Sequence, residues 1–433
     1  MWTLTPLPAE HAGPLLIGFS GGLDSTVLLH RIAHDPALRE RGLVAIHVHH
    51  GLHADADTWA EHCRRRCAQW NVRCEIVSVE VSRTGGEGLE AAARRVRYEA
   101  LARHLVTGGV LLTAHHRDDQ AETFLLRALR ASGVDGLAAM QAWRSFGEGW
   151  HWRPLLEVPR SELLAYAQAH ALTWIEDPSN ADVDLDRNFL RHEVLPLLRQ
   201  RWPQAETLLA RSAALAGESV RLLRAEDAVA LAAASTLDPH ALRVSALLRL
   251  PRERRARVLR HWIHSLDLPP LPGEGVARIE AELLRARDDA EAGFRWRHAV
   301  IRRWRDLLHA EVAVPDLAPD WTVEWTTTLP LPLPTRGELA LHGQAWPTPL
   351  RVSGRRGGER LRLPGRSHSH ALKKLLQSQG IPPWERVALP LLWDGDELLA
   401  AGNLLLSARL DEWLRAHATE LRWQRSSPPF SLT

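Results

Sequence analysis

A short run of small, hydroxyl-bearing and acidic residues, Ser20-Gly21-Gly22-Leu23-Asp24-Ser25, has the clearest chemical meaning in this chain. It follows an apolar stretch at residues 14–19 and precedes residues 23–32, whose apolar side chains have helical spacing. The two glycines permit a tight turn and close approach of the backbone to a ligand. Such a turn presents backbone N–H groups at a helix N-terminus, where the helix dipole favours an anion. The sequence therefore predicts a phosphate site in which all six residues contact a nucleotide: Ser20, Gly21, Gly22, Leu23, Asp24 and Ser25.

Asp24 stands out in this loop because a carboxylate repels phosphate. A magnesium ion between the two would remove the conflict, since Mg²⁺ prefers oxygen ligands. The pattern G-x-x-x-x-G-K-[ST] of a Walker loop is absent, and the only lysines of the chain are Lys373 and Lys374. The alternative is an ordinary strand–turn–helix bend capped by Asp24 or Ser25. The pattern favours ATP with Mg²⁺ over that alternative.

A second polar motif, residues 114–123, has the sequence AHHRDDQAET and follows another apolar stretch. On a helix, Asp119 and Glu122 share a face because they are three residues apart. Capping of a helix N-terminus explains Asp118. It does not explain why His115, Asp119 and Glu122 gather at one strand end. Several polar groups therefore converge at this strand end, and we count His115 among the candidate contacts to the nucleotide.

The elements that must position these motifs alternate between apolar strands and helices over roughly the first 130 residues. This alternation predicts an α/β fold, a doubly wound parallel sheet covered by helices on both faces. Ligands of such sheets bind at the carboxyl ends of the strands, where both motifs fall. The expected strands are 14–19, 43–49, 74–79 and 110–114, and the expected helices are 23–32, 55–70, 89–105 and 118–129.

The rest of the chain changes character twice. Residues 203–310 carry apolar residues at helical spacing with arginines between them, which predicts an all-helical middle domain. A segment rich in proline and threonine, 311–335, predicts a linker. Beyond it, short strands and a single helix predict a small α+β domain at 336–433. The catalytic, ATP-binding domain is then 1–202.

Composition sets outer limits on this organisation. The 433 residues allow about three domains at roughly 150 residues each. No apolar run reaches the roughly 18 residues that cross a bilayer, and the first ten residues lack the features of a targeting segment. Three cysteines are too few for a disulfide framework. We therefore expect a cytoplasmic protein.

The loop at residues 20–25 resembles that of the pyrophosphate-loop ATPases, which have an adenine-nucleotide alpha-hydrolase-like fold, cleave ATP between the α and β phosphates and form an adenylated intermediate. Further motifs resemble one subfamily, the tRNA(Ile)-lysidine synthases. In the first of these motifs, His47-Val48-His49-His50-Gly51-Leu52-His53, two residues depart from the family pattern. His49 and His53 stand where that pattern has asparagine and arginine. A zinc site is the alternative reading of this histidine-rich stretch, but its spacing matches no common zinc pattern. The motifs are His47-Val48-His49-His50-Gly51-Leu52-His53, the AHHRDDQAET stretch, Asp177-Pro178-Ser179-Asn180, and Arg187-Asn188-Phe189-Leu190-Arg191.

The resemblance implies a complete reaction. Free L-lysine would be joined to C2 of the wobble cytidine of the isoleucine tRNA with a CAU anticodon, with release of pyrophosphate and AMP. Asp24 and Asp119 would hold Mg²⁺, and Asp119 and Glu122 would receive the amino groups of lysine. Arginines would support the reaction centre or grip phosphates, although solvated helix arginines remain the alternative. The implied catalytic residues are Asp24, Asp119, Glu122, Arg97 and Arg187, and a homodimer occurs in the family.

The RNA side of this hypothesis depends on a basic strip, residues 351–374, with eight basic residues against one acid, Glu359. Such a strip suits phosphate contacts, with a solvated basic face as the alternative. Two rival functions stay open. One is another pyrophosphate-loop enzyme such as a tRNA cytidine thiolase, although Cys63, Cys67 and Cys74 lack its C-x-x-C pairing. The other is a non-catalytic tRNA-binding protein.

Overall fold

The structure, a computed structural model, describes residues 2–81, 88–287, 292–334 and 337–424. The chain divides into two compact units, Met1–Glu226 and Asp227–Ser431, which are described one at a time. Within the described ranges, no helix is both long and apolar enough to cross a bilayer.

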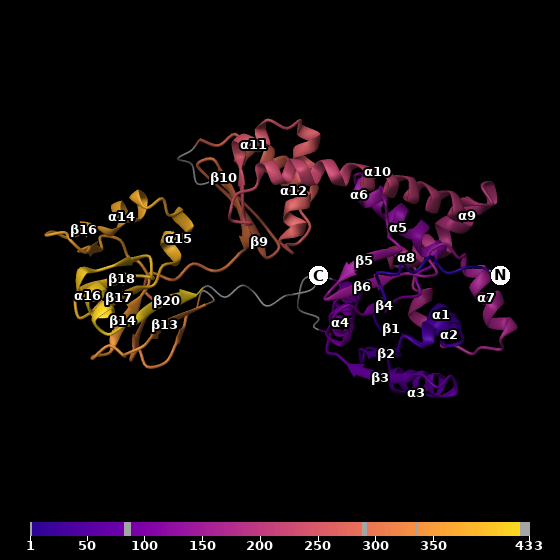
Figure 1. Ribbon diagram of the computed structural model, residues 1–433. Coiled ribbons are helices and arrows are strands. Elements are labelled where there is room, and N and C mark those ends of the chain that lie inside the picture. The colour runs from indigo at the N-terminus through magenta and orange to yellow at the C-terminus, as the bar shows by residue number, and fades with distance from the viewer. Residues whose placement is uncertain (1, 82–87, 288–291, 335–336, 425–433) are drawn as a thin grey trace. The chain divides into compact units, whose positions relative to one another are not determined.

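The N-terminal unit is built on a six-stranded sheet with the order β3-β2-β1-β4-β6-β5 (Figure 1). All neighbouring strands are parallel except β5 and β6, which form an antiparallel hairpin at one edge. The predicted parallel sheet is confirmed. The hairpin was not predicted, because its tryptophan- and histidine-containing strands lack an aliphatic run. The strands are β1 (Leu15–Gly18), β2 (Leu43–His49), β3 (Arg73–Ser78), β4 (Val110–Leu112), β5 (Trp143–Phe146) and β6 (Gly149–Trp152).

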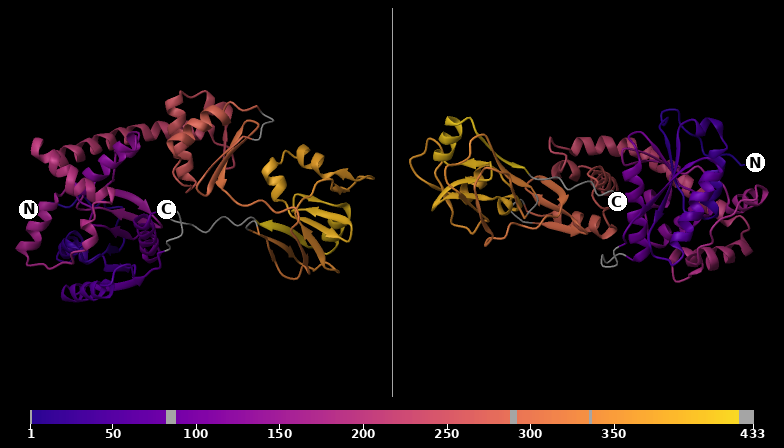
Figure 2. Two further views of the ribbon diagram at one scale, coloured as in Figure 1. Left: turned by 180° about the vertical axis from the view of Figure 1, so that it is seen from behind. Right: turned by 90° about the horizontal axis from the view of Figure 1, so that it is seen from below.

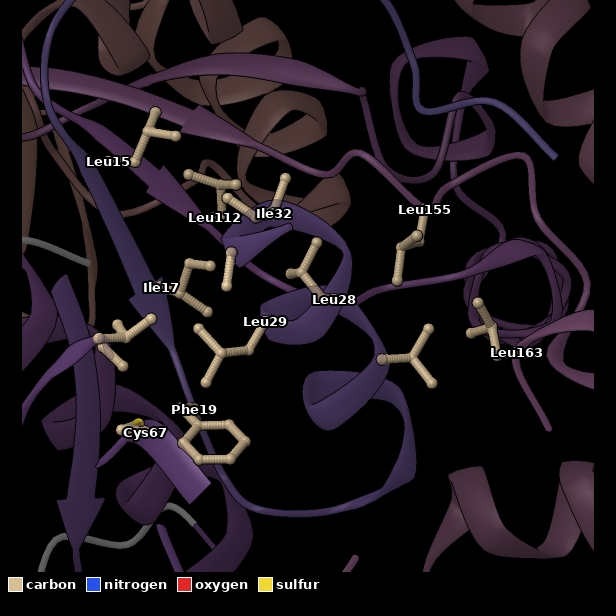
Figure 3. Packing of buried hydrophobic residues seen from close by; sticks show 14 of the residues in the cluster. Leu15, Ile17, Phe19, Leu28, Leu29, Ile32, Cys67, Leu112, Leu155 and Leu163 are labelled. Atoms are coloured by element: carbon tan, nitrogen blue, oxygen red, sulfur yellow. The ribbon is translucent and has the colours of Figure 1, made fainter. Parts of the chain in front are cut away.

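Helices cover both faces of this sheet, as the doubly wound prediction requires. Alternate residues of β1 point to opposite faces. Leu15 and Ile17 pack with Leu28 and Leu29 of α1 (Figure 3). Leu16 packs on the other face in a cluster that includes residues of α4. The helices are α1 (Leu23–Ala33), α2 (Pro36–Arg39), α3 (Ala56–Gln69), α4 (Leu89–His104), α5 (Arg117–Leu129), α6 (Val134–Leu137) and α7 (Arg160–Ala169).

Shorter helical pieces follow α7. Asp177 accepts a hydrogen bond from Ser179 N and caps a 3₁₀ turn, η1 (Pro178–Ala181). Next come α8 (Asp186–Phe189) and a π-helical turn, η2 (Leu190–Val194). π turns in otherwise α-helical segments are frequent at functional sites. The remaining helices are α9 (Leu195–Arg201) and the long α10 (Ala205–Ala234).

The first part of the second unit corrects the expectation of an all-helical region. Its helices are accompanied by β-strands (Figure 2). These strands form a four-stranded antiparallel sheet with the order β7-β10-β9-β8. Phe294, Trp296, Leu308 and Ala310 are buried in alternation with more exposed neighbours, which is the period of a strand. The elements are β7 (Ala241–Arg243), α11 (Val244–Leu248), α12 (Arg252–Ser265), α13 (Gly273–Arg278), η3 (Ile279–Leu283), β8 (Gly293–Trp296), β9 (Ala299–Trp304) and β10 (Leu307–Val312).

The last part of the chain is a small α+β structure, as predicted, but it has three helices where one was expected. They are α14 (Leu372–Ser378), α15 (Pro383–Ala388) and α16 (Ala408–Ala416). A five-stranded antiparallel sheet contains β11 (Thr322–Trp325), β14 (Leu350–Ser353), β17 (Leu391–Asp394), β18 (Glu397–Ala401) and β19 (Leu405–Leu406). Smaller sheets join β12 (Leu331–Pro332), β13 (Glu338–His342) and β20 (Glu420–Gln424), and β15 (Arg360–Leu361) with β16 (His370–Ala371).

Candidate active site

A cavity of about 1850 Å³ opens at the carboxyl ends of β1, β2 and β4. The position follows the rule for open parallel sheets. The predicted site residues that line it come from the loop after β1, the start of α1, the segment between β4 and α5, and the helices α4, α5 and α8. They are Ser20, Gly22, Leu23, Asp24, Ser25, Arg97, His115, Asp119, Glu122 and Arg187.

Gly21 is the one predicted loop residue that faces away from the cavity. It has a left-handed φ of +83°. Its carbonyl oxygen accepts hydrogen bonds from Ile175 N (2.9 Å) and Thr26 Oγ1 (3.2 Å). A Cβ atom there would lie 2.5 Å from Ile175 Cδ1 and 2.9 Å from Cys63 Sγ. Gly21 therefore shapes the loop from behind, and contact with a ligand falls to its neighbours.

The rest of the loop is held by its own side chains. Ser25 Oγ donates to Gly22 O at 3.0 Å and lies 3.0 Å from Ser20 Oγ. Gly22 is the N-cap of α1 and has extended backbone angles. In the part of the chain that the structure describes, no side chain caps this helix start. The N-terminal N–H groups of α1 are thus left without a capping side chain at the cavity, an arrangement that favours an anion.

Two carboxylates from different strand ends meet beside this loop. Asp24 Oδ2 and Asp119 Oδ2 each lie 3.5 Å from Nε2 of the fully buried His116. Burial alone would lower the pKa of His116, but Asp119, Asp24 and Asp118 raise it to about 9. Burial raises the pKa of Asp24, but His116, Arg160 and Arg191 outweigh that effect and leave it below its ordinary value. Both acids are therefore balanced by cationic side chains.

This pair fits a magnesium ion better than a zinc ion. Asp24 Oδ1 is buried without a hydrogen-bond partner among the described residues. Mg²⁺ commonly takes one or two carboxylates and completes its shell with water and substrate phosphates. In the described ranges, no group of three or more His, Cys, Asp or Glu side chains has the geometry to hold a metal by itself. Asp24 and Asp119 would be the protein ligands of such an ion.

Glu122 is fully buried and is held by two arginines. Arg191 Nε donates to Glu122 Oε1 at 2.7 Å, and Arg191 Nη2 donates to Glu122 Oε2 and Asp119 Oδ1, both at 3.1 Å. Arg187 Nε lies 4.0 Å from Glu122 Oε2, and its Nη2 donates to Thr123 Oγ1 at 3.2 Å. Burial raises the pKa of Glu122 although Arg191 opposes the shift. Arg191, from the π-helical turn, thus bridges two carboxylates of the AHHRDDQAET motif, those of Asp119 and Glu122.

The α4 side of the cavity is basic. Arg94 and Arg97 lie over the ring of Tyr98, at 5.1 and 5.7 Å from its centroid. Burial lowers the pKa of Arg97, and Arg94 and Arg187 add to the effect. Half-buried cations near one another call for an anionic ligand. The acidic pair at α1 and α5 and the arginines of α4 therefore line the same cavity with opposite charges.

The histidine-rich stretch after β2 does not gather around one point. His47 Nδ1 lies 3.0 Å from Phe19 O, and this histidine is buried. His49 pairs with Asp57 at 3.0 Å, and His53 stacks on Trp59 with centroids 4.7 Å apart. These three histidines have separate partners, so the zinc alternative loses its support.

The cysteines have a packing role. Cys63 and Cys67 are fully buried in the core beneath the loop, and Cys74 is half-buried. All three are free thiols. Burial raises the pKa of Cys63, a direction that keeps its thiol protonated.

Arg160 is a site residue that sequence reasoning missed. Its Nε lies 3.9 Å from Asp24 Oδ1, and its backbone N donates to Asp118 Oδ1 at 3.0 Å. It begins α7, far from both motifs in the chain. The start of a helix after Pro159 was a readable signal, but nothing in the sequence indicated that this helix would end at the cavity.

Comparison with known proteins identifies the family. The chain matches a PP-loop domain over residues 4–198, a TilS substrate binding domain over 242–309 and a TilS substrate C-terminal domain over 350–423. It is 51% identical over 425 residues to the tRNA(Ile)-lysidine synthase of Xanthomonas campestris pv. campestris (strain 8004), covering 98% of each chain. It is 55% identical over 418 residues to that of Xylella fastidiosa (strain Temecula1), covering 95% of each. The chain belongs to the tRNA(Ile)-lysidine synthase family. The resemblance read from the sequence motifs is confirmed.

The basic strip predicted in this family member lies in its C-terminal part and is mostly exposed. Arg355 is the exception, because its guanidinium contacts Arg386 O at 3.3 Å and Glu359 Oε2 at 3.4 Å. Glu359 is buried and also accepts from the backbone N of Arg356 at 2.8 Å. Arg355 and Glu359 therefore hold the strip's first loop in shape. The exposed members are Arg351, Arg356, Arg360, Arg362, Arg366, Lys373 and Lys374.

Proposed function

We propose that this chain joins the ε-amino group of free L-lysine to C2 of the wobble cytidine of the isoleucine tRNA with a CAU anticodon. In the first step the C2 oxygen of the cytidine attacks the α-phosphate of ATP, and pyrophosphate leaves. In the second step the lysine amine attacks C2, and AMP leaves with that oxygen. The product is lysidine. The proposal places the reaction in the cytoplasm, and a homodimer stays a prediction.

The observation that supports this proposal most directly is the meeting of Asp24 and Asp119 beside the loop. Their carboxylates lie at equal distances, 3.5 Å, from one buried nitrogen of His116. Two acids next to an anion-binding helix start make sense when a divalent cation accompanies the nucleotide. Bound there, Mg²⁺ would offset charge that develops on the departing pyrophosphate. The N–H groups at the start of α1 would add to that stabilisation.

The acidic face of α5 supports lysine as the second substrate. A free ammonium needs carboxylate partners when it leaves water. Asp119 and Glu122 supply them, and both accept hydrogen bonds from Arg191 at 2.7–3.1 Å. The amine must lose a proton before it attacks C2. Glu122, whose pKa burial raises, is suited to accept that proton.

The exposed arginines and lysines of the strip support a polyanionic partner. Each phosphate contact that a basic side chain makes releases counterions, so the affinity for RNA would fall with salt. The reacting cytidine must be unstacked, which a single-stranded anticodon loop permits.

One assay tests the proposed function against its rivals. The chain is incubated with ATP, Mg²⁺, labelled lysine and a transcript of the tRNA with a CAU anticodon. We expect label in the tRNA, together with one pyrophosphate and one AMP per lysine. A transcript in which uridine replaces the wobble cytidine, so that the anticodon is UAU, is the matched control. Release of inorganic phosphate, or pyrophosphate without label in the tRNA, would show a different reaction.

A further inference from the structure

A chain of hydrogen bonds runs from the edge of the sheet to the cavity through three side chains. His151, on β6, is fully buried, and its Nε2 lies 2.8 Å from Thr113 Oγ1. The same hydroxyl oxygen lies 2.7 Å from Nδ1 of His115. His115 lines the cavity. Among the described residues, no hydrogen-bond partner reaches its other ring nitrogen, Nε2.

The outer end of this chain sets the position of every proton in it. Arg144 Nε lies 3.2 Å and Arg153 Nη2 lies 3.3 Å from Nδ1 of His151. A guanidinium can only donate, so Nδ1 of His151 must accept. Burial and the two nearby arginines lower the pKa of His151, which keeps the ring neutral. A neutral ring that accepts at Nδ1 carries its proton on Nε2.

The proton positions at the inner end of this hydrogen-bond chain, on Thr113 and His115, then follow. Nε2–H of His151 donates to the Thr113 oxygen. Among the described residues, Nδ1 of His115 is the one acceptor within reach of the Thr113 hydroxyl proton, so Thr113 donates to it. His115 therefore accepts at Nδ1 and carries its own proton on Nε2. Burial, with Arg153 and Arg94, lowers the pKa of His115 well below its ordinary value, so the ring does not gain a second proton near neutral pH.

We propose that Thr113 and His151 are positioning residues that fix His115 as its Nε2–H tautomer, so that His115 donates a hydrogen bond to an oxygen of the substrate. The inference rests on the proposed function for the identity of that substrate. The acceptor is a phosphate oxygen of ATP or the C2 oxygen of the cytidine. Both carry more negative charge as the adenylate forms, and a fixed N–H donor stabilises such charge without reorganisation.

The tautomer is measured directly on the full-length protein with ¹⁵N-labelled histidine. Two-bond ¹H–¹⁵N spectra distinguish a ring nitrogen that carries a proton from one that does not, and His115→Gln identifies the His115 signals by their loss. We expect a protonated Nε2 and a bare Nδ1 from pH 6 to 9. A His115 that is protonated on Nδ1, or on both nitrogens, overturns the proposal.

The hydrogen-bond chain from His151 through Thr113 to His115, called the relay below, is tested by removing the hydroxyl group of Thr113. Thr113→Val should lower kcat for adenylate formation about tenfold and change the His115 signals, while Thr113→Ser should restore both. Thr107→Val is the matched control, because that exposed threonine donates to Glu148 at 3.0 Å and does not line the cavity. An unchanged tautomer and an unchanged kcat in Thr113→Val would overturn the relay.

Two further readouts separate the possible outcomes. A rise in the KM of ATP in His115→Gln assigns the acceptor to a phosphate, and a rise in the KM of tRNA assigns it to the cytidine. If the wild-type protein makes no lysidine, the proposed function fails, but the NMR result still decides the tautomer. If it makes lysidine while Thr113→Val behaves as Thr107→Val does, the relay alone fails.

Discussion

Replacing Gly21 with alanine tests whether the loop's shape depends on packing from behind. An L-residue pays roughly 1–2 kcal/mol in the left-handed region that Gly21 occupies at φ +83°. The new Cβ would also lie 2.5 Å from Ile175 Cδ1 and 2.9 Å from Cys63 Sγ. The Ile175 methyl is the end of a flexible side chain, but Cys63 is fully buried and cannot retreat. Overpacking of this kind costs about 1–3 kcal/mol. Together with the backbone cost, we expect the free energy of unfolding to fall by about 2–5 kcal/mol.

Gly108→Ala is the matched control for this substitution. Gly108 has a φ of +74°, and a Cβ there would meet nothing within 4 Å. In this variant the free energy of unfolding should fall only by the backbone contribution, about 1–2 kcal/mol. The slowest-exchanging amides of β1 report the free energy of opening the sheet in both variants. Calorimetry should show ATP binding at least tenfold weaker in Gly21→Ala and unchanged in Gly108→Ala. Equal stabilities together with normal ATP binding in both variants would refute the packing argument.

Three further predictions concern charge. Asp24→Ala should abolish adenylation and leave tRNA affinity nearly unchanged; substantial pyrophosphate release by this variant would remove Asp24 from the metal site. Changing Arg356 and Arg360 to glutamine should weaken tRNA binding and reduce the slope of log affinity against log salt by about 2, with ATP binding unaffected. An unchanged slope in this double variant would show that the strip has no role in RNA binding. Arg355→Gln should instead loosen the loop that Arg355 and Glu359 hold. Burial, with His34 and His170, lowers the pKa of His30 to about 4. The stability that neutral His30 provides is therefore fully present above pH 6.5 and is lost as the pH falls toward 4. The free energy of unfolding should fall by up to about 3 kcal/mol over this range. His30→Gln should flatten that part of a pH–stability curve, and an unchanged curve would contradict the assignment.

The sequence predicted the central sheet well because β1, β2 and β4 are short aliphatic runs bounded by polar motifs. The predicted strand at 43–49 has the same bounds as β2, and the predicted helix at 23–32 ends one residue before α1 does. The β8–β10 sheet was missed because its residues are interspersed with arginines, as in the preceding helices. There the alternation of buried and exposed side chains is clear only once the strands are paired.

The candidate site was predictable wherever a motif ends a strand. Ser20 and Asp24 follow β1 and Asp119 follows β4, and parallel neighbours bring their carboxyl ends together. Partners from distant segments were not predictable. Arg160 reaches Asp24 from the start of α7, and Ile175 holds the back of the loop through the carbonyl of Gly21. Such contacts depend on how helices pack, which short motifs do not encode.

The carboxylates and arginines that line the cavity limit which combination of ligands it can bind at one time. An anion alone would be attracted by Arg94 and Arg97 but repelled by Asp24 and Asp119, which line the same cavity. A cation alone would leave those arginines, one of them with a pKa already lowered by burial, without a partner. A metal–nucleotide pair together with a cationic amino acid satisfies both sets, since the metal and ammonium face carboxylates and the phosphates face arginines and helix N–H groups. Because Arg191 already spans Asp119 and Glu122, it can hold the acidic pair together until the second cation arrives. The cavity is therefore suited to bind its substrates in combination, and measured ATP affinity should rise when lysine is present.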